Sequence, residues 1–293
     1  MGVDTLILRV AAIAHRSPEA VAIVDGEKRV SYAGFWQQAR QFAALLLEQG
    51  IRRGDRVAVV LPNRIEAAVA CYGAWLLGAV VVPLNVQAKQ RDLSPWLRHC
   101  GARFVLHEAR NSEALAALAD APSAYSLGLA GDHWELPPVT RGIDDDGLST
   151  SSDLAMILYT SGTTGTPKGV MLSHGNLASN VESILDYLEL TPADSVMSLL
   201  PFYYAYGASV MHTHLASGAC LHLAPNLLFP HQIVETMARE RITGFSGVPS
   251  TFMLLLDRVQ LDQYDLRALR YLTQAGGAMS PALTLRLRKA LPG

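Results

Sequence analysis

The sequence predicts an α/β fold built on largely parallel sheet. Segments that read as short aliphatic strands alternate with segments of helical periodicity along most of the 293 residues, and this alternation is typical of doubly wound α/β domains. The run 56–61 is almost entirely aliphatic, as expected for a strand whose sheet has helices on both faces. Gly276 and Gly277 follow a predicted strand at 269–273, and ligands of open α/β sheets bind beyond that end of the strands.

The composition predicts a globular chain with a large buried core. Half of the residues are hydrophobic, and 24 basic residues nearly balance 26 acidic ones. This balance does not favour nucleic acid or an anionic membrane surface as a partner. We therefore expect any binding of a polyphosphate to depend on a local group of residues.

Cysteine use and one uncharged segment bear on where the protein works. Cys71, Cys100 and Cys220 are far apart and set in apolar sequence, which favours buried, reduced thiols in a cytoplasmic protein. No charged residue occurs from 67 to 86, a length that could span a membrane. Gly78 and the valines after it indicate a helix followed by a buried strand instead, so we expect no membrane span.

The first part of the chain is predicted to alternate as the fold class requires. Its expected elements are a helix over 1–17, a hairpin over 22–30, a helix ending at Gly50, strands at 56–61, 80–82 and 103–106, and helices at 65–77 and 91–100. From 111 to 152 the sequence becomes rich in alanine, then in proline and acid. We interpret 111–152 as a surface excursion in which the acidic triplet at 144–146 is solvated rather than metal-binding. The chain is therefore divided into a first α/β half over 1–152 and a second over 153–293.

The second half repeats the alternation. Its expected elements are strands at 154–158, 196–200, 220–223, 242–245 and 269–273, and helices at 177–188, 232–241, 251–259 and 282–291, with a further apolar helix ending at Gly218. Ser280 and Pro281 are residues that commonly begin a helix, so the last helix is predicted to start there.

The densest group of glycines and hydroxyls lies at 159–176, with the sequence Tyr-Thr-Ser-Gly-Thr-Thr-Gly-Thr-Pro-Lys-Gly-Val-Met-Leu-Ser-His-Gly-Asn. Glycines let a backbone approach a ligand closely, so that several N–H groups can point into one concavity. The hydroxyls add donors, and Lys168 adds positive charge. This composition indicates a phosphate-binding loop, with a flexible linker as the alternative. It is not a Walker A loop, because Lys168 is followed by Gly169 rather than by Ser or Thr.

The stretch 159–176 closely resembles the signature loop of the adenylate-forming superfamily, which includes acyl-CoA synthetases, firefly luciferase and nonribosomal peptide adenylation domains. The similarity extends to Leu200-Pro201 with the aromatic residues after it, to 244–250 and to 275–278, and so spans nearly the whole chain. It implies the AMP-binding N-terminal domain of such an enzyme, with stacked α/β sheets in an αβαβα arrangement that is incomplete at the C-terminus.

The resemblance also implies a reaction and a set of site residues. The reaction is ATP-dependent activation of a carboxylic acid to an acyl-adenylate, followed by transfer to the thiol of coenzyme A or of a phosphopantetheine on an acyl carrier protein. The residues implied to lie beside the carboxylic acid substrate are Tyr204, Tyr206 and Gly207. The implied ATP-binding residues are Thr160, Ser161, Gly162, Thr163, Thr164, Gly165, Lys168, Gly276, Gly277 and Ala278, with Lys168 and Thr163 taking part in catalysis.

Two departures from the family pattern concern the part of the site near the carboxylic acid substrate. Many acyl-activating members have a histidine where this chain has Tyr204. Members that activate amino acids usually place an aspartate after the aromatic segment, whereas residues 205–211 contain no acidic side chain. We therefore expect a fatty or other apolar acid, as in fatty acid metabolism.

Other parts of the family pattern are absent from these 293 residues. They are the Tyr-Gly-x-Thr-Glu motif, whose glutamate helps to hold Mg²⁺, and the C-terminal domain with its catalytic lysine. We expect the N-terminal part of a longer ligase, inactive alone, with the main Mg²⁺ ligand outside this chain. The alternative is a non-catalytic nucleotide-binding or interaction module that kept the loop and lost the catalytic domain.

Overall fold

The fold is taken from a computed structural model that describes residues 5–131, 134, 136, 143, 149–160, 167–224 and 227–291. Contacts within the chain group it into two compact units, the first made of 1–19 with 32–182 and the second of 20–31 with 183–293. In the described residues, each unit holds one six-stranded sheet. The hairpin at 20–31 belongs to the second sheet, so the chain enters the second unit and returns to the first before residue 33.

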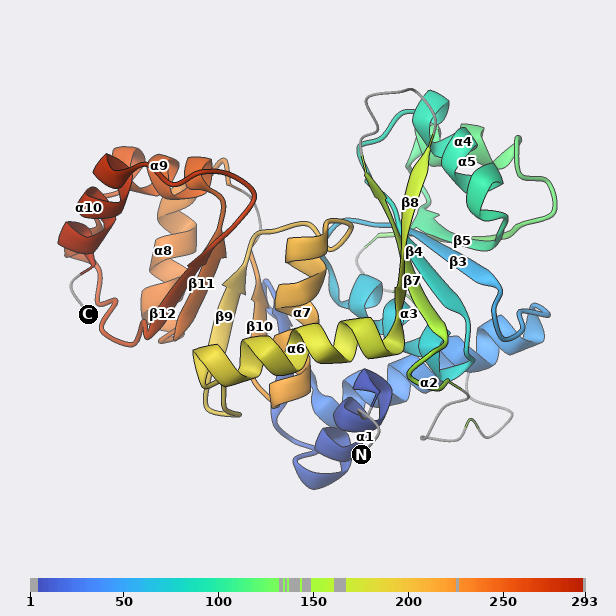
Figure 1. The fold of residues 1–293 in the computed structure, drawn as a ribbon, viewed down its shortest axis with the longest axis horizontal. Helices are drawn as coiled ribbons and strands as arrows, with labels where there is room; N and C mark the ends of the chain where they lie inside the picture. Colours follow the sequence, from blue (N-terminus) through green and yellow to red (C-terminus); the bar gives the residue numbers. More distant parts are fainter. Residues whose placement is uncertain are drawn as a thin grey trace. The chain divides into compact units, whose positions relative to one another are not determined.

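The first unit is a mostly parallel sheet with helices on both faces. The strand order is β6-β5-β3-β4-β7-β8, and only the β7–β8 pair is antiparallel. Helices α4 and α5 pack on one face, while α2 and α3 lie on the other (Figure 1). The elements are α1 (Leu6–Arg16), α2 (Tyr32–Glu48), β3 (Arg56–Val60), α3 (Ile65–Leu76), β4 (Val80–Pro83), α4 (Gln90–Cys100), β5 (Ala102–Glu108), α5 (Ser112–Leu118), β6 (Tyr125–Leu129), β7 (Leu154–Thr160) and β8 (Lys168–Ser173).

Helix α6 (His174–Leu188) begins in the first unit and ends in the second. The second sheet has the order β12-β11-β9-β10-β1-β2, in which only β1–β2 is antiparallel. Helix α7 covers one face, and α8 and α9 cover the other (Figure 1). The elements are β1 (Val21–Asp25), β2 (Lys28–Ser31), β9 (Ser195–Ser198), α7 (Ala205–Ser217), β10 (Cys220–Leu223), α8 (Pro230–Arg239), β11 (Gly244–Gly247), α9 (Pro249–Arg258), the 3₁₀ turn η1 (Leu261–Gln263), β12 (Tyr271–Gln274) and α10 (Pro281–Ala290).

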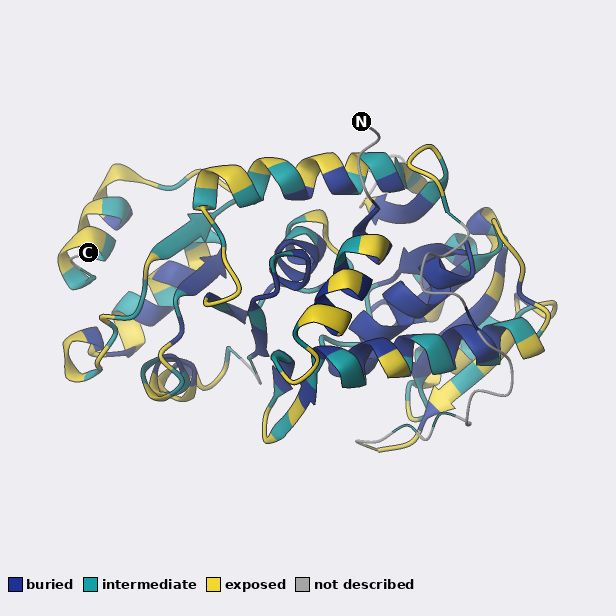
Figure 2. Ribbon diagram, turned by 90° about the horizontal axis from the view of Figure 1, so that it is seen from below, coloured by how far each residue is buried: buried dark blue, intermediate teal, exposed yellow. Residues whose placement is uncertain are grey.

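Burial follows from this layering, because buried residues gather on the strands and on the helix faces that cover them (Figure 2). The uncharged run 67–86 is the extreme case. All of α3 and all of β4 are buried, since α3 is enclosed by α2 and the strands. Among the described residues, no helix has both the length and the apolarity needed to cross a membrane.

Most predicted elements are present. All three cysteines are free, and Cys71 and Cys100 are buried as expected, whereas Cys220 is only partly buried. Gly50 and Gly218 end their helices in the left-handed region, with φ of 78° and 84°. Ser280 accepts a hydrogen bond from the amide of Leu283, at 3.2 Å, as a helix cap should. The α/β fold class predicted from alternation is therefore confirmed. The division into 1–152 and 153–293 stays a prediction, while contacts place β7 and β8 with the first unit.

The prediction that 111–152 is only a surface excursion was wrong. This segment contains α5, and it contains β6, which adds a parallel strand to the sheet beside β5. At Gly128 within β6 a Cβ would lie 3.1 Å from Cε1 of His107, so glycine lets the strand pack closely. The acidic triplet 144–146 lies outside the described residues.

Two other segments also differ from expectation. Residues 168–173, expected as part of a loop, form β8, which pairs antiparallel with β7. The strand predicted at 242–245 lies instead at Gly244–Gly247. The prediction ended the strand too early because its glycines resemble the end of a strand. Glycine at 244 is required by packing, since a Cβ there would lie 2.0 Å from the Tyr271 ring.

Candidate functional site

Two of the predicted phosphate-binding residues, Thr160 and Lys168, lie at the end of the β7–β8 hairpin where the chain passes from β7 to β8. They face each other as a cross-strand pair. Both are exposed, and the Lys168 side chain has no hydrogen bond or ion pair to another residue that the structure describes. Of the remaining predicted residues, Ser161, Gly162, Thr163, Thr164 and Gly165 lie outside the described part of the chain. An exposed ammonium at the end of a paired hairpin is suited to meet an anion.

The hairpin is held in register by a close glycine contact. Gly169 pairs with Tyr159, and a Cβ on Gly169 would lie 2.6 Å from Cγ2 of Ile157. Any larger residue would push β8 away from β7 and move Lys168 with it. The glycine after Lys168 therefore has a packing role in addition to any role in phosphate binding.

Beyond β8, the chain is tied back to the segment that precedes β7. The amide of His174 donates to the carbonyl of Asp153 at 3.0 Å, and Arg53 pairs with the Asp153 carboxylate at 2.6 Å. The hydrogen bond from Arg53 lowers the pKa of Asp153. Burial lowers the pKa of the His174 imidazole to about 4, so this ring is neutral at pH 7 and packs against Trp75.

In the second unit, the predicted nucleotide contacts form a tight turn after β12. Gly276 has φ of 81°, a conformation that favours glycine. The side-chain amide of Gln274 donates to the carbonyl of Ala275 at 3.1 Å and to that of Gly277 at 2.7 Å. Gly276, Gly277 and Ala278 are exposed, so their backbone is open to a ligand.

The aromatic segment leads into α7, also in the second unit. Tyr204 precedes the helix, is 54% exposed and has its ring 4.7 Å from that of Tyr203. Gly207 is buried in the first turn, where a Cβ would lie 2.1 Å from the carbonyl oxygen of Pro201. Glycine therefore lets the helix begin directly against the end of the preceding strand.

Tyr206 belongs to a chain of hydroxyls that the sequence did not reveal. Its hydroxyl lies 2.7 Å from Oγ1 of Thr273, which lies 2.8 Å from Oγ of Ser246. Ser198, Ser246 and Thr273 are register partners on three neighbouring parallel strands, so their side chains point to the same face. Their positions at the carboxyl ends of predicted strands were the only signal available.

A second buried contact holds α7 on β12. His214 Nδ1–H donates to the carbonyl of Val210 at 2.7 Å, and the Tyr271 hydroxyl lies 2.6 Å from His214 Nε2, which accepts from it. Burial lowers the pKa of His214 to about 4, so the neutral form that this arrangement requires is the one present at pH 7. Tyr206 and His214 thus hold the two ends of α7 against β12.

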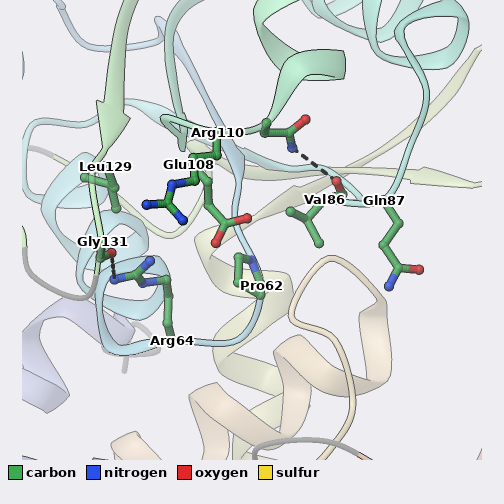
Figure 3. A pocket seen from close by; sticks show the side chains of 9 residues that line it. Pro62, Arg64, Val86, Gln87, Glu108, Arg110, Leu129 and Gly131 are labelled. Carbon is green, nitrogen blue, oxygen red and sulfur yellow. Dashed lines mark hydrogen bonds between the residues drawn. The ribbon is translucent and has the colours of Figure 1, made fainter.

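The first unit also contains a pocket of about 770 Å³. It opens beyond the carboxyl ends of β3, β4, β5 and β6, where the strand order changes direction, and this is where open α/β sheets bind ligands. Figure 3 shows Arg64, Glu108 and Arg110 around it, with Arg64 reaching the carbonyl of Gly131. Arg64 is buried, and its Nε and Nη2 donate to the Glu66 carboxylate at 2.7 and 3.1 Å, whereas Arg110 is exposed.

No group of three or more His, Cys, Asp or Glu side chains among the described residues is arranged to hold a metal ion.

Residues 10–293 match the family described as AMP-binding enzyme. The chain belongs to the AMP-binding enzyme family. Among curated relatives of this AMP-binding chain, a feruloyl-CoA synthase of Amycolatopsis sp is 33% identical over 279 residues, covering 92% of this chain and 53% of that protein. Tyrocidine synthase 3 of Brevibacillus parabrevis is 29% identical over 283 residues, covering 95% of this chain and 4% of that protein.

Solved structures of other proteins have the same fold as this AMP-binding chain. ATP-bound MatB from Rhodopseudomonas palustris has a TM-score of 0.85 and 27% identity over 99% of this chain and 58% of that one. VinN has a TM-score of 0.88 and 24% identity over 100% of this chain and 73% of that one. The expected fold, that of the N-terminal domain of adenylate-forming enzymes, is confirmed.

Proposed function

We propose that these residues form the nucleotide-binding part of an AMP-forming acid–thiol ligase. The observation that carries the proposal is Lys168, which is exposed at the end of the β7–β8 hairpin and whose side chain has no partner among the described residues, in a chain of the AMP-binding enzyme family. Thr160 and Lys168 of the first unit are proposed to contact the phosphates of ATP. Gly276, Gly277 and Ala278 of the second unit are proposed to contact the nucleotide through their exposed backbone.

The proposed first step is attack of a carboxylate oxygen on the α-phosphorus of ATP. The new oxygen–phosphorus bond gives the acyl-adenylate, and the bond to the β-phosphate oxygen breaks to release pyrophosphate. The protein has to orient the reactants and neutralise charge on the leaving group. Lys168 supplies positive charge for that purpose, and Thr163, which lies outside the described residues, is proposed to donate a hydrogen bond.

The acid is proposed to be fatty or otherwise apolar and to lie beside Tyr204, Tyr206 and Gly207. Ala208, Val210 and Met211 are buried, and no acidic residue occurs in 205–211. An amino acid would bring an ammonium group, which needs a nearby carboxylate. Tyr204 is exposed, and its hydroxyl can donate or accept a hydrogen bond.

The second step is proposed to transfer the acyl group to a thiol, with release of AMP. Coenzyme A and a carrier-bound phosphopantetheine share this thiol but differ in their other end, which in coenzyme A is a phosphorylated nucleotide. The pocket lined by Arg64, Glu108 and Arg110 does not distinguish these acceptors, because Glu108 balances Arg110 and Arg64 is paired with Glu66. Both acceptors therefore stay part of the proposal.

Calorimetric titration of the 293-residue chain with ATP tests the nucleotide part of the proposal. We expect binding that is weakened at least tenfold by Lys168→Ala. A wild-type chain that does not bind ATP, or a Lys168→Ala variant with unchanged affinity, would show the proposal to be wrong. Arg98→Ala, at an exposed position of α4, is the control for loss of a surface cation.

An ATP–pyrophosphate exchange assay with a panel of carboxylic acids tests the chemistry. The chain spans only 53% of the feruloyl-CoA synthase that it matches, so we propose that these residues alone exchange pyrophosphate slowly or not at all. A normal exchange rate would refute that statement but support acid activation. The 293-residue chain and a form extended to the length of its relatives can be compared. If both bind ATP and neither exchanges pyrophosphate, the non-catalytic nucleotide-binding module is favoured.

A further inference from the structure

Tyr159 is the last residue before the proposed phosphate contact Thr160, and it is anchored to helix α4. Its hydroxyl lies 2.7 Å from Nδ1 of His99 and 3.3 Å from the carbonyl oxygen of Trp96. The Trp96 ring stacks on it with centroids 5.7 Å apart and planes 25° apart. The tyrosine is only 9% exposed, so one end of the hairpin is fixed by a helix distant in sequence.

The hydrogen-bond directions follow from the partners. The carbonyl of Trp96 can only accept, so the tyrosine proton is given to it. The tyrosine oxygen then accepts from His99, whose proton must be on Nδ1. Burial raises the pKa of Tyr159, which keeps the phenol protonated and this pattern intact at neutral pH.

Because β7 and β8 are paired, the contacts that hold Tyr159 also position both proposed phosphate contacts. Tyr159 is paired with Gly169, and the next pair, at the end of the hairpin where β7 connects to β8, is Thr160 with Lys168. Gly169 has no spare room against Ile157, so a shift of Tyr159 moves β8 as well as β7. Small displacements matter here, because a shift of about 1 Å in a positioning element can cost about 100-fold in rate.

We propose that His99 is a positioning residue for the proposed ATP site, acting through Tyr159 to fix where Thr160 and Lys168 stand. This rests on the proposed function for the identity of the ligand. His99 is exposed and its ring meets Tyr159 edge-on, at 5.7 Å and 74°. A histidine on an exposed helix face adds little to the core, so its contact with the tyrosine hydroxyl is the effect to be measured.

The variants separate this hydrogen bond from packing. His99→Leu removes the donor, His99→Asn keeps an N–H close to the Nδ1 position, and Tyr159→Phe removes only the hydroxyl. Arg98→Leu, one residue earlier on the same exposed stretch of α4, is the matched control. Two measurements are made on the 293-residue chain: the Kd values for ATP and AMP by calorimetry, and amide hydrogen exchange of peptides from β7 and β8 without nucleotide.

We expect His99→Leu and Tyr159→Phe to raise the Kd for ATP by about three- to tenfold, the factor that one hydrogen bond supplies. The Kd for AMP, which lacks the β and γ phosphates, should stay within about twofold. Exchange in β7 and β8 should become faster, while His99→Asn and Arg98→Leu should resemble the wild type.

Three outcomes would overturn the proposal. One is that His99→Leu leaves both ATP affinity and exchange like those of Arg98→Leu. Another is that ATP and AMP are weakened equally, and the third is that Asn fails to restore what Leu removes. If the wild-type chain binds no ATP, the proposed function fails, and the exchange of β7 and β8 alone then decides whether His99 positions the hairpin.

Discussion

Replacing Gly207 by alanine is expected to destabilise the protein although alanine favours helices. The added Cβ would lie 2.1 Å from the carbonyl oxygen of Pro201 and 2.6 Å from that of Leu200. Both atoms are backbone, and ordinary contact begins at 3.4 Å, so the start of α7 has to move by about 1.3 Å, a displacement typical of overpacking. Such a movement would also break the 2.7 Å contact between Tyr206 and Thr273.

The magnitude follows from three terms. Overpacking costs about 1–3 kcal/mol, and loss of one hydrogen bond costs about 1 kcal/mol. The better helix propensity of alanine returns about 1 kcal/mol. We therefore expect Gly207→Ala to lower the free energy of unfolding by about 1–3 kcal/mol.

Urea unfolding at 25 °C, followed by circular dichroism, measures this change. Tyr206→Phe is the matched control, because it removes the hydrogen bond without the overlap and should cost about 1 kcal/mol or less. A Gly207→Ala protein as stable as the wild type would refute the reasoning, since α7 would then have room that the structure denies it.

The remaining predictions concern charged groups. Lys168→Ala should raise the Kd for ATP about 10- to 100-fold in calorimetry and leave the urea midpoint unchanged, because Lys168 is exposed. Glu66→Gln should lower the free energy of unfolding by about 3 kcal/mol, since it breaks the buried pair with Arg64; an unchanged midpoint would contradict that. Burial raises the pKa of Asp194, but hydrogen bonds from Arg270, Thr191 and Thr243 outweigh it and lower the pKa overall. The stability from Asp194 is therefore present above its unfolded pKa of about 3.9 and is lost as the pH falls through its lower folded value. The destabilisation by Arg270→Leu in urea unfolding should accordingly be greater at pH 7 than at pH 2, and an equal loss at both would refute this.

Much of the fold could be predicted because its signals are local. The apolar period of α3 and β4, the glycine ends of α2 and α7 and the Ser280 cap all act within a few residues of chain. Local signals failed where pairing with another strand decided the outcome. Strand β6 exists because it pairs with β5, and β8 exists because it pairs with β7.

The candidate site was likewise only partly recognisable from the sequence. Lys168, Gly276 and Tyr206 were found from motifs, since residue type and spacing are visible in the sequence. Thr273 and Ser246 were not, because a hydroxyl at a strand end has no meaning until neighbouring strands bring it beside Tyr206.

The sequence by itself determined the fold class and the family, and it supplied the residue types that are proposed to contact a polyphosphate. These follow from periodicity and from a continuous motif, which need no knowledge of distant contacts. Only the tertiary structure decided that the hairpin at 20–31 completes the second sheet and that Tyr159 is held by His99. Strand order and side-chain contact depend on packing between separate segments, such as His99 and Tyr159, which are 60 residues apart, and no local pattern encodes that pairing.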